Sequence, residues 1–238
     1  MRAAFALLLL ITACESRPPL TYAKLTATMR AAATAAIPQP PAFDDLLARV
    51  PSDAYAVLGI DLARAHSSRS VMEGLANLLR RIGVEVDVRA GRVVLAGTPA
   101  GFVVVTPSSP TDTGGGMADA LAGVSRGRTG FGAIKLNGEL KRELVQLIPD
   151  LEKLRWIAGT FDSTNGISIT VDAVFPDAMT AAKLPVTISI GRKVAATQLP
   201  AAVATAFDKV AFTAMGNAIR ISAVWTEADV QALSSIAR

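Results

Sequence analysis

Hydrophobic residues recur along this chain with two different periods, and the changes of period divide it into expected helices and strands. In the clearest helical segment, Ser67 or Ser68 precedes an apolar series that continues to Ile82, and Gly83 follows as the stop. That series comprises Val71, Leu75, Leu78, Leu79 and Ile82. Further helices are expected at 43–50, 118–124, 139–148, 176–183, 200–207 and 226–237.

A period of two marks the strands. Residues 84–89 alternate strictly between valines and charged residues, which predicts a strand with one face in water. Asn165-Gly166 stands between two alternating runs, a strong short-range indication of a β-hairpin. Strands are expected at 54–61, 84–89, 92–96, 102–106, 129–136, 155–163, 166–175, 210–214 and 218–225. Residues 184–192 remain ambiguous because a β-rich run, 186–190, lies within them.

The order of these elements predicts an α+β fold, mainly an antiparallel sheet with helices covering one face. Residues 55–106 and 131–175 share the order strand, helix and hairpin-joined strands, which suggests two related halves at 42–107 and 129–238. A flexible loop is expected between them at 108–128, because 107–117 has no apolar period and contains Gly114-Gly115-Gly116. The same order resembles uncharacterised exported lipoproteins with duplicated halves, and that resemblance implies no functional residue.

The first fourteen residues follow a different plan. Arg2 gives a short positive region, Ala3 to Ile11 is an uninterrupted apolar run, and Thr12 and Ala13 are small. This order is typical of a secretory signal peptide, predicted here over residues 1–13. The apolar run has nine residues, well short of the roughly 20 that a membrane-spanning helix needs.

Ile11-Thr12-Ala13-Cys14 resembles the lipobox of bacterial lipoproteins. The resemblance implies that the Cys14 sulfur carries a lipid, that cleavage occurs just before Cys14, and that acyl chains such as palmitate hold the chain on a membrane. Cys14 is the only cysteine, so no intramolecular disulfide can account for it. The alternative is an ordinary signal peptide with an incidental cysteine. Residues 14–41, flanked by proline pairs, are expected to form a lipidated tether.

The residue after the lipobox cysteine bears on the membrane. In Gram-negative lipoproteins an aspartate at that place usually retains the protein in the inner membrane, whereas this chain has Glu15. The resemblance therefore implies the outer membrane of the cell envelope, facing either the periplasm or the outside.

Charge and composition narrow the partners. The net charge is +4, and aromatic residues make up 5% of the 238 residues. This modest excess permits an envelope protein or an anionic polymer as partner, but it is too small and scattered to indicate nucleic acid. The scarcity of aromatic residues argues against stacking on bases.

One loop places serine, histidine and aspartate close together in sequence. It contains Asp61, His66, Ser67 and Ser68, and His66 is the only histidine. Catalytic triads meet across a fold rather than within one loop, and the chain has no Gly-x-Ser-x-Gly elbow. A surface or capping role is therefore expected for His66.

Other patterns offer little chemistry. One histidine and a lipidated cysteine cannot supply a zinc site, and Asp44, Asp45 and Asp53 lack the order of a calcium loop. Gly127, Gly130 and Gly132 form no phosphate-binding loop. Carboxylates that could pair only in space are Glu139, Glu143, Glu152 and Asp162. Basic doublets are Arg80-Arg81, Arg126 with Arg128, Lys141-Arg142 and Arg192-Lys193.

The sequence thus predicts a lipoprotein with a non-enzymatic binding or structural role, and it predicts no catalytic, cofactor-binding or metal-binding residue. The membrane itself, through lipid on Cys14, is the clearest expected partner. The competing hypothesis is an envelope hydrolase whose site is assembled only in the fold.

Overall fold

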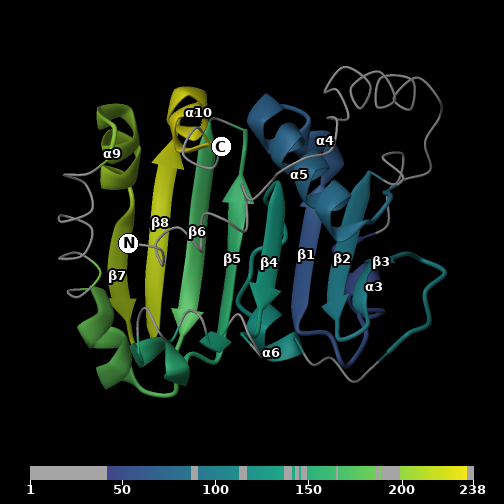
Figure 1. Cartoon of the computed structure of the whole chain (residues 1–238). Coiled ribbons are helices and arrows are strands. Elements are labelled where there is room, and N and C mark those ends of the chain that lie inside the picture. Colours follow the sequence, from purple (N-terminus) through teal and green to yellow (C-terminus); the bar gives the residue numbers. More distant parts are fainter. Residues whose placement is uncertain are drawn as a thin grey trace.

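Eight strands form one antiparallel sheet in the computed structural model of this protein (Figure 1). The structure describes residues 42–86, 91–112, 117–136, 141–142, 145, 149–164, 166–185, 188 and 199–234. The strand order across the sheet is β3-β2-β1-β4-β5-β6-β8-β7. The strands are β1 (Ala56–Asp61), β2 (Arg92–Thr98), β3 (Gly101–Val105), β4 (Gly130–Ile134), β5 (Trp156–Asp162), β6 (Ile167–Val174), β7 (Ala211–Met215) and β8 (Ala218–Trp225).

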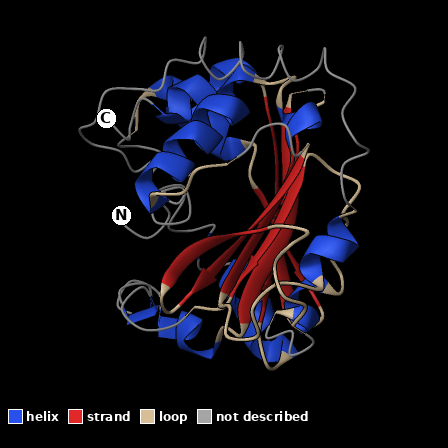
Figure 2. Cartoon of the chain, turned by 90° about the vertical axis from the view of Figure 1, so that its right-hand side faces the viewer, coloured by secondary structure: helices blue, strands red, loops and turns tan. Residues whose placement is uncertain are grey.

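Helices pack on both faces of this sheet, which Figure 2 shows nearly edge-on. We call the face that carries Ile60, Leu95 and Ala223 the front face, and the face that carries Val57, Val94 and Phe131 the back face. The helices include α3 (Phe43–Leu47), α4 (Leu62–Ala65), α5 (Arg69–Ile82), α6 (Ala118–Leu121), α9 (Ala201–Asp208) and α10 (Glu227–Ser234), with the 3-10 helix η2 (Pro149–Lys153). A further helix occupies residues 178–185. The predicted α+β fold is therefore confirmed. The expectation that helices cover one face is wrong, because α3 and α6 pack on the back face while α4, α5, α9 and α10 pack on the front face.

The front face is covered in three places by clusters of buried apolar side chains. Under α4 and α5, Ile60 and Leu95 of the sheet meet Met72 and Leu75. Under α9 and α10, Ala223 and Trp225 of β8 meet Val203, Ala206 and Leu233. Figure 1 shows α4, α5, α9 and α10 gathered toward one end of the strands. In the third place, Ala173 of β6 and Ile219 of β8 meet Ala181 and Leu184 of the helix at 178–185.

The back face is apolar only in its first half. There Phe131 is 1% exposed and makes an edge-to-face contact with Phe43 of α3, with ring centroids 4.9 Å apart. The ring lies over Gly59 of β1, where an added Cβ would stand 2.3 Å from it. An aromatic ring on a cross-strand glycine fills the space that a side chain would otherwise take, so α3 can approach the sheet closely.

The clearest sequence signals for helix ends are confirmed. The Ser68 hydroxyl accepts the Val71 N–H at the start of α5, and Gly83 ends that helix with φ +68°. The Gly83 N–H bonds to the Arg80 carbonyl and the Val84 N–H to the Leu79 carbonyl, as in a Schellman motif. In α10, Thr226 and Asp229 exchange side-chain and backbone hydrogen bonds as a capping box does.

Most of the expected strands are also confirmed, including the hairpin of β5 and β6 at Gly166, whose φ is +86°. The strand expected over 84–89 is wrong in its described part, because residues 84–86 lie in no strand. The Val84 N–H instead closes the end of α5, although Val84 and Val86 still pack against the cluster under that helix. Residues 87–89 lie outside the described part of the chain.

Several other expectations fall partly outside the described residues. Of the helix expected over 139–148, Lys141, Arg142 and Val145 are helical. The helix expected after Pro176 occupies 178–185, and of the ambiguous segment that follows, Ile188 is helical while 186–187 and 189–192 are not described. The tether, the signal peptide and Gly114–Gly116 also lie outside the described residues.

The boundary between the two expected halves falls where β1 pairs with β4, inside the continuous sheet. The expected loop between them is described at 108–112 and 117–128, where Asp112 bonds to Ala48 and Ser52, and Met117 is buried. Mobility of this loop and duplication of the halves stay predictions.

Candidate functional site

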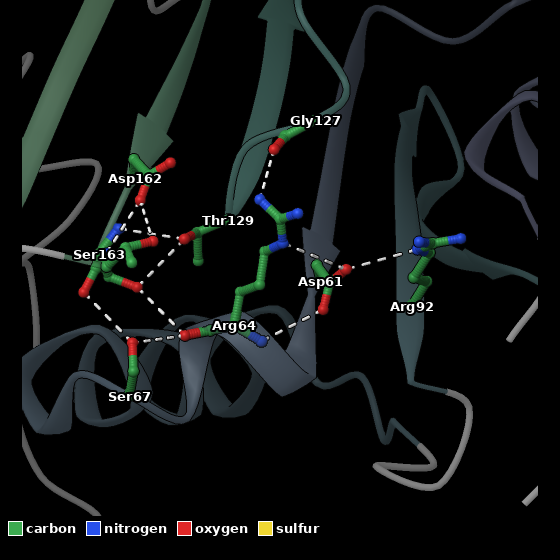
Figure 3. A network of polar contacts seen from close by, with 9 residues as sticks. Asp61, Arg64, Ser67, Arg92, Gly127, Thr129, Asp162 and Ser163 are labelled. Atoms are coloured by element: carbon green, nitrogen blue, oxygen red, sulfur yellow. Dashed lines mark hydrogen bonds and ion pairs between the residues drawn. The ribbon is translucent and has the colours of Figure 1, made fainter.

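A group of linked polar side chains lies where β1 and β5 end and β4 begins (Figure 3). The turn from β1 into α4 supplies Asp61, Arg64 and Ser67, and β2 supplies Arg92. The segment before β4 and the end of β5 supply Thr129, Asp162 and Ser163. Antiparallel pairing of β1, β4 and β5 brings these segments together at one end of the central strands.

Asp61 is the electrostatic centre of this group. Its carboxylate accepts the Arg64 N–H at 3.2 Å and so caps α4, and it lies 3.4 Å from Nε of Arg92. The Arg64 side chain lies with its Nε 4.0 Å from the same carboxylate, and its Nη1 donates to the carbonyl of Gly127 (Figure 3). Asp61 therefore joins β1, α4 and β2 through one carboxylate.

Two buried hydroxyl groups extend the network behind it. Thr129 is fully buried, and its hydroxyl accepts the Ser163 N–H at 3.0 Å. The hydroxyls of Ser163 and Ser67 both donate to the carbonyl of Arg64, at 3.3 Å and 2.7 Å. The carbonyl at the end of α4 is thereby satisfied by two serines, one of them 99 residues away in the chain.

Asp162 is the last residue of β5 and lies at the same end of the central strands. Its carboxylate accepts the hydroxyl of Thr164 at 2.6 Å and the Thr164 N–H at 2.9 Å, and it lies 3.4 Å from Nη1 of Arg128. The hydrogen bond from the Thr164 hydroxyl is the main reason that the pKa of Asp162 is lowered, and the backbone bond and Arg128 act in the same direction. This carboxylate is therefore held in its charged form, as a turn residue rather than a proton donor.

The polar groups of this network form their hydrogen bonds with one another and with neighbouring backbone groups. The carboxylates accept backbone and arginine donors, and the serine hydroxyls donate to carbonyl oxygens. A nucleophilic serine needs an adjacent base that can accept its proton, whereas the Ser67 hydroxyl donates its hydrogen bond to the Arg64 carbonyl. What this geometry supplies is a connection between three strand ends and a helix.

The serine, histidine and aspartate that are neighbours in sequence form no triad. His66 is the C-terminal cap residue of α4, is half-buried, and has an Nδ1 atom with no hydrogen-bond partner. Ser68 caps α5 and donates to Oε1 of Glu227 at 2.8 Å. The His66 backbone thus ends α4, the Asp61 side chain begins α4, and the Ser68 side chain begins α5.

The carboxylates considered for acid–base chemistry are not assembled in the described residues. Glu152 lies exposed in η2, Asp162 lies at the network just described, and Glu139 and Glu143 fall outside the described part of the chain. Among the described residues, no group of three or more His, Cys, Asp or Glu side chains is placed to hold a metal ion. Gly130 and Gly132 lie within β4, and an added Cβ on Gly130 would meet the Phe161 ring at 2.2 Å. These two glycines therefore serve close packing of strands.

The basic doublets are used locally. Arg126 pairs with Asp44 of α3 at 2.6 Å, and Arg128 with Asp162 at 3.4 Å. Arg80 donates to Asn77 one turn earlier in α5. Lys141 and Arg142 are helical, while Arg192 and Lys193 lie outside the described residues.

Thr129 and Ser163 were missed by the analysis of the sequence. Each stands at the end of an expected strand, where a hydroxyl is usually a turn residue, and only the pairing of β4 with β5 shows that they meet. A hollow between α3 and the loop after β3 was likewise not predictable; its lining residues are Asp45, Leu46, Ala48, Arg49, Pro107 and Thr111.

Two further searches bear on what this chain does. No helix in the described residues is both long and apolar enough to cross a bilayer. Comparison with protein-family models, curated proteins and solved structures finds no match to this chain.

Proposed function

We propose that this protein is a lipid-anchored protein of the bacterial cell envelope, with a domain that binds or supports an envelope partner and performs no catalysis. The observation that carries the proposal is Ile11-Thr12-Ala13-Cys14 directly after a short apolar run. Two or more acyl chains on the Cys14 end give stable membrane attachment, since each buried methylene contributes about 0.8 kcal/mol.

The charge distribution agrees with a membrane-proximal tether. Residues 15–41 contain Arg17, Lys24 and Arg30 against one acidic residue, Glu15. Cationic residues next to an anchor favour an anionic lipid surface. The net charge of the chain is +4, of which the mature tether contributes +2 by this count, three cations minus one anion.

The non-enzymatic role is supported by how the polar residues of the domain are used. The Asp61 and Asp162 carboxylates accept bonds from neighbouring backbone, hydroxyl and arginine groups. Such pairing stabilises chain ends and turns, whereas a catalytic group needs a bond free for substrate.

The anchor is tested by Cys14→Ser in the full chain, expressed in a Gram-negative host fed a clickable palmitate analogue. Labelling is expected to disappear and the protein to leave the membrane fraction. Retention of the variant in the membrane fraction would overturn the lipid anchor. Ser16→Ala is the matched control, since it changes a neighbouring small residue and leaves the motif intact.

The choice of membrane is tested separately by Glu15→Asp. The resemblance implies that an aspartate at this place retains lipoproteins in the inner membrane, so the variant is expected to move there while keeping its label. Glu15→Asp keeps the negative charge, whereas Glu15→Gln removes it without creating the retention residue, and the Gln variant should stay in the outer membrane. Wild-type protein found in the inner membrane would refute the outer-membrane assignment and would leave the lipid anchor standing.

A further inference from the structure

The two edge strands of the sheet differ in how readily their sequences would allow another strand to pair with them. Strands β3 and β7 form the two edges, at opposite ends in Figure 1. In an edge strand, every second residue directs its backbone N–H and C=O away from the sheet, which makes it a template for another strand. Proteins usually protect such edges with charge, proline or a bulge.

Strand β3 has none of these protections within it. Its residues are Gly101, Phe102, Val103, Val104 and Val105. No charged residue occurs anywhere from Val93 to Thr111. Three consecutive valines are strongly favoured in extended strands, so the sequence of this edge favours pairing rather than opposing it.

Two of its apolar side chains stand in solvent on opposite faces of the sheet. Phe102 is 39% exposed and Val103 is 41% exposed. The inner side of the Phe102 ring is already occupied by Tyr55, with centroids 6.5 Å apart, and by Gly97. Among the described residues, β3 pairs with β2 alone.

Strand β7 is a poorer template. It contains three small residues, Ala211, Thr213 and Ala214, in place of valines. On the back face, Thr213 pairs with Arg220, whose guanidinium donates to Asp172 of β6, on the side of β8 away from the edge. The difference between the two edges therefore lies in their residues, since alanine is less favoured in strands than valine.

We propose that β3 is the contact through which two copies of this chain associate, edge to edge and antiparallel, into one continuous sheet. In an antiparallel pair, directly opposed residues lie on the same face of the sheet. When two identical strands pair about a two-fold axis perpendicular to the sheet, the residue nearest the axis therefore lies opposite its own copy. Val103 is the middle residue of Gly101–Val105, so Phe102 then lies opposite Val104 of the second copy. The absence of charge lets this self-facing arrangement form without like-charge repulsion.

Cysteine crosslinking in membranes of cells that make the full chain tests this geometry. In antiparallel pairs, opposed Cα atoms are about 4.5–5.5 Å apart, within the range that a disulfide spans. Val103→Cys is expected to give a crosslinked dimer under mild oxidation. Phe102→Cys and Val104→Cys should each crosslink weakly alone and strongly when the two variants are co-expressed.

Val224→Cys is the matched control. Val224 is 64% exposed but lies in β8, between β6 and β7, and so it should give no dimer. The wild-type chain is the second control, because Cys14 is its only thiol if the lipid anchor is absent. A wild-type disulfide dimer would refute the anchor, whereas monomeric Val103→Cys with unlinked wild type would refute the contact.

A solution measurement separates this contact from a β7 contact. Sedimentation of the detergent-solubilised chain is expected to show two copies, and Val103→Lys should return the protein to one copy that still unfolds cooperatively on heating. Thr213→Lys, the equivalent change on β7, should leave the dimer intact. Loss of association in Thr213→Lys, or persistence of the dimer in Val103→Lys, would overturn the proposal.

Discussion

The back face of the sheet has two ends that are built in different ways. At the end formed by β1, β2 and β4, apolar residues including Val57, Val94 and Phe131 lie under α3 and α6. At the end formed by β6, β8 and β7, which we call the polar end, hydroxyl and charged residues occupy the same face. These residues are Ser168, Thr170, Asp172, Thr213, Arg220 and Ser222.

The difference shows where stability comes from in each region. β2 is covered on both faces, so all its residues from Val93 to Thr98 are buried. β6 is covered mainly on the front face, and its back-face residues Ser168, Thr170 and Asp172 are half-buried. The apolar end therefore depends on close packing, while the polar end depends on pairs of side chains and on its front-face clusters.

The largest effect is expected from removing the central ring of the apolar end. Phe131→Ala should lower the free energy of unfolding by about 3–5 kcal/mol, since the ring is 1% exposed and contacts both Gly59 and Phe43. Val224→Ala, on the same face at the polar end, should change it by less than about 0.5 kcal/mol because Val224 is 64% exposed. Urea unfolding measures both. Equal losses would mean that the two ends do not differ.

A second test concerns close approach of strands where the two ends meet. An added Cβ on Gly159 of β5 would stand 2.3 Å from the Thr170 carbonyl oxygen of β6. Backbone cannot move aside as a side chain can, so Gly159→Ala should destabilise by about 1–3 kcal/mol. Gly74→Ala, in α5 with nothing within 4 Å of the new methyl, should instead stabilise by up to about 1 kcal/mol. Thermal midpoints that fall in both variants would contradict this account.

How far the sequence revealed this arrangement depends on whether a feature is local. The Ser168, Thr170 and Asp172 alternation in β6 indicated a strand with one polar face, and the capping residues of α5 and α10 indicated their helix ends. Val84 to Val86 misled because alternate burial arises there without a strand. The meeting of Thr129 with Ser163, and of Phe131 with Gly59, depends on which strands pair, and periodicity along one strand does not contain that information.

The dependence of the polar end on charge should appear in acid. Asp229 accepts bonds from Lys209 at 2.6 Å and from Thr226, and the lysine contact is the main cause that lowers the pKa of Asp229 to about 2. The pKa of Asp177 is also lowered, chiefly by the Thr180 N–H. A carboxyl whose folded pKa lies below its unfolded value of about 3.9 stabilises the fold above that pH. This contribution is lost as pH falls toward about 2.

Thermal midpoints measured from about pH 5 to about pH 2 should therefore fall, with uptake of up to about one proton on unfolding assigned to Asp229. Asp229→Asn should start lower and show a shallower fall over the same range. Hydrogen exchange should rise first in α9 and α10 rather than in β1 and β2. An unchanged pH slope in Asp229→Asn would show that this carboxylate is not the group responsible.

The smallest effect is expected at the ion pair on the back of the polar end. Two hydrogen bonds join Arg220 to Asp172, at 2.8 Å and 2.7 Å, and they raise the pKa of Arg220. The side chains are 41% and 33% exposed, so solvent screens the attraction. Asp172→Asn should cost less than about 1 kcal/mol, and Arg220→Gln should cost a similar amount. In the double variant the two losses should not add, because either change alone already breaks the pair.

A double-mutant cycle at low and high salt measures the coupling, which should shrink as salt rises. A coupling that exceeds the loss from Phe131→Ala would reverse the comparison, since the polar end would then be the one that holds the sheet together.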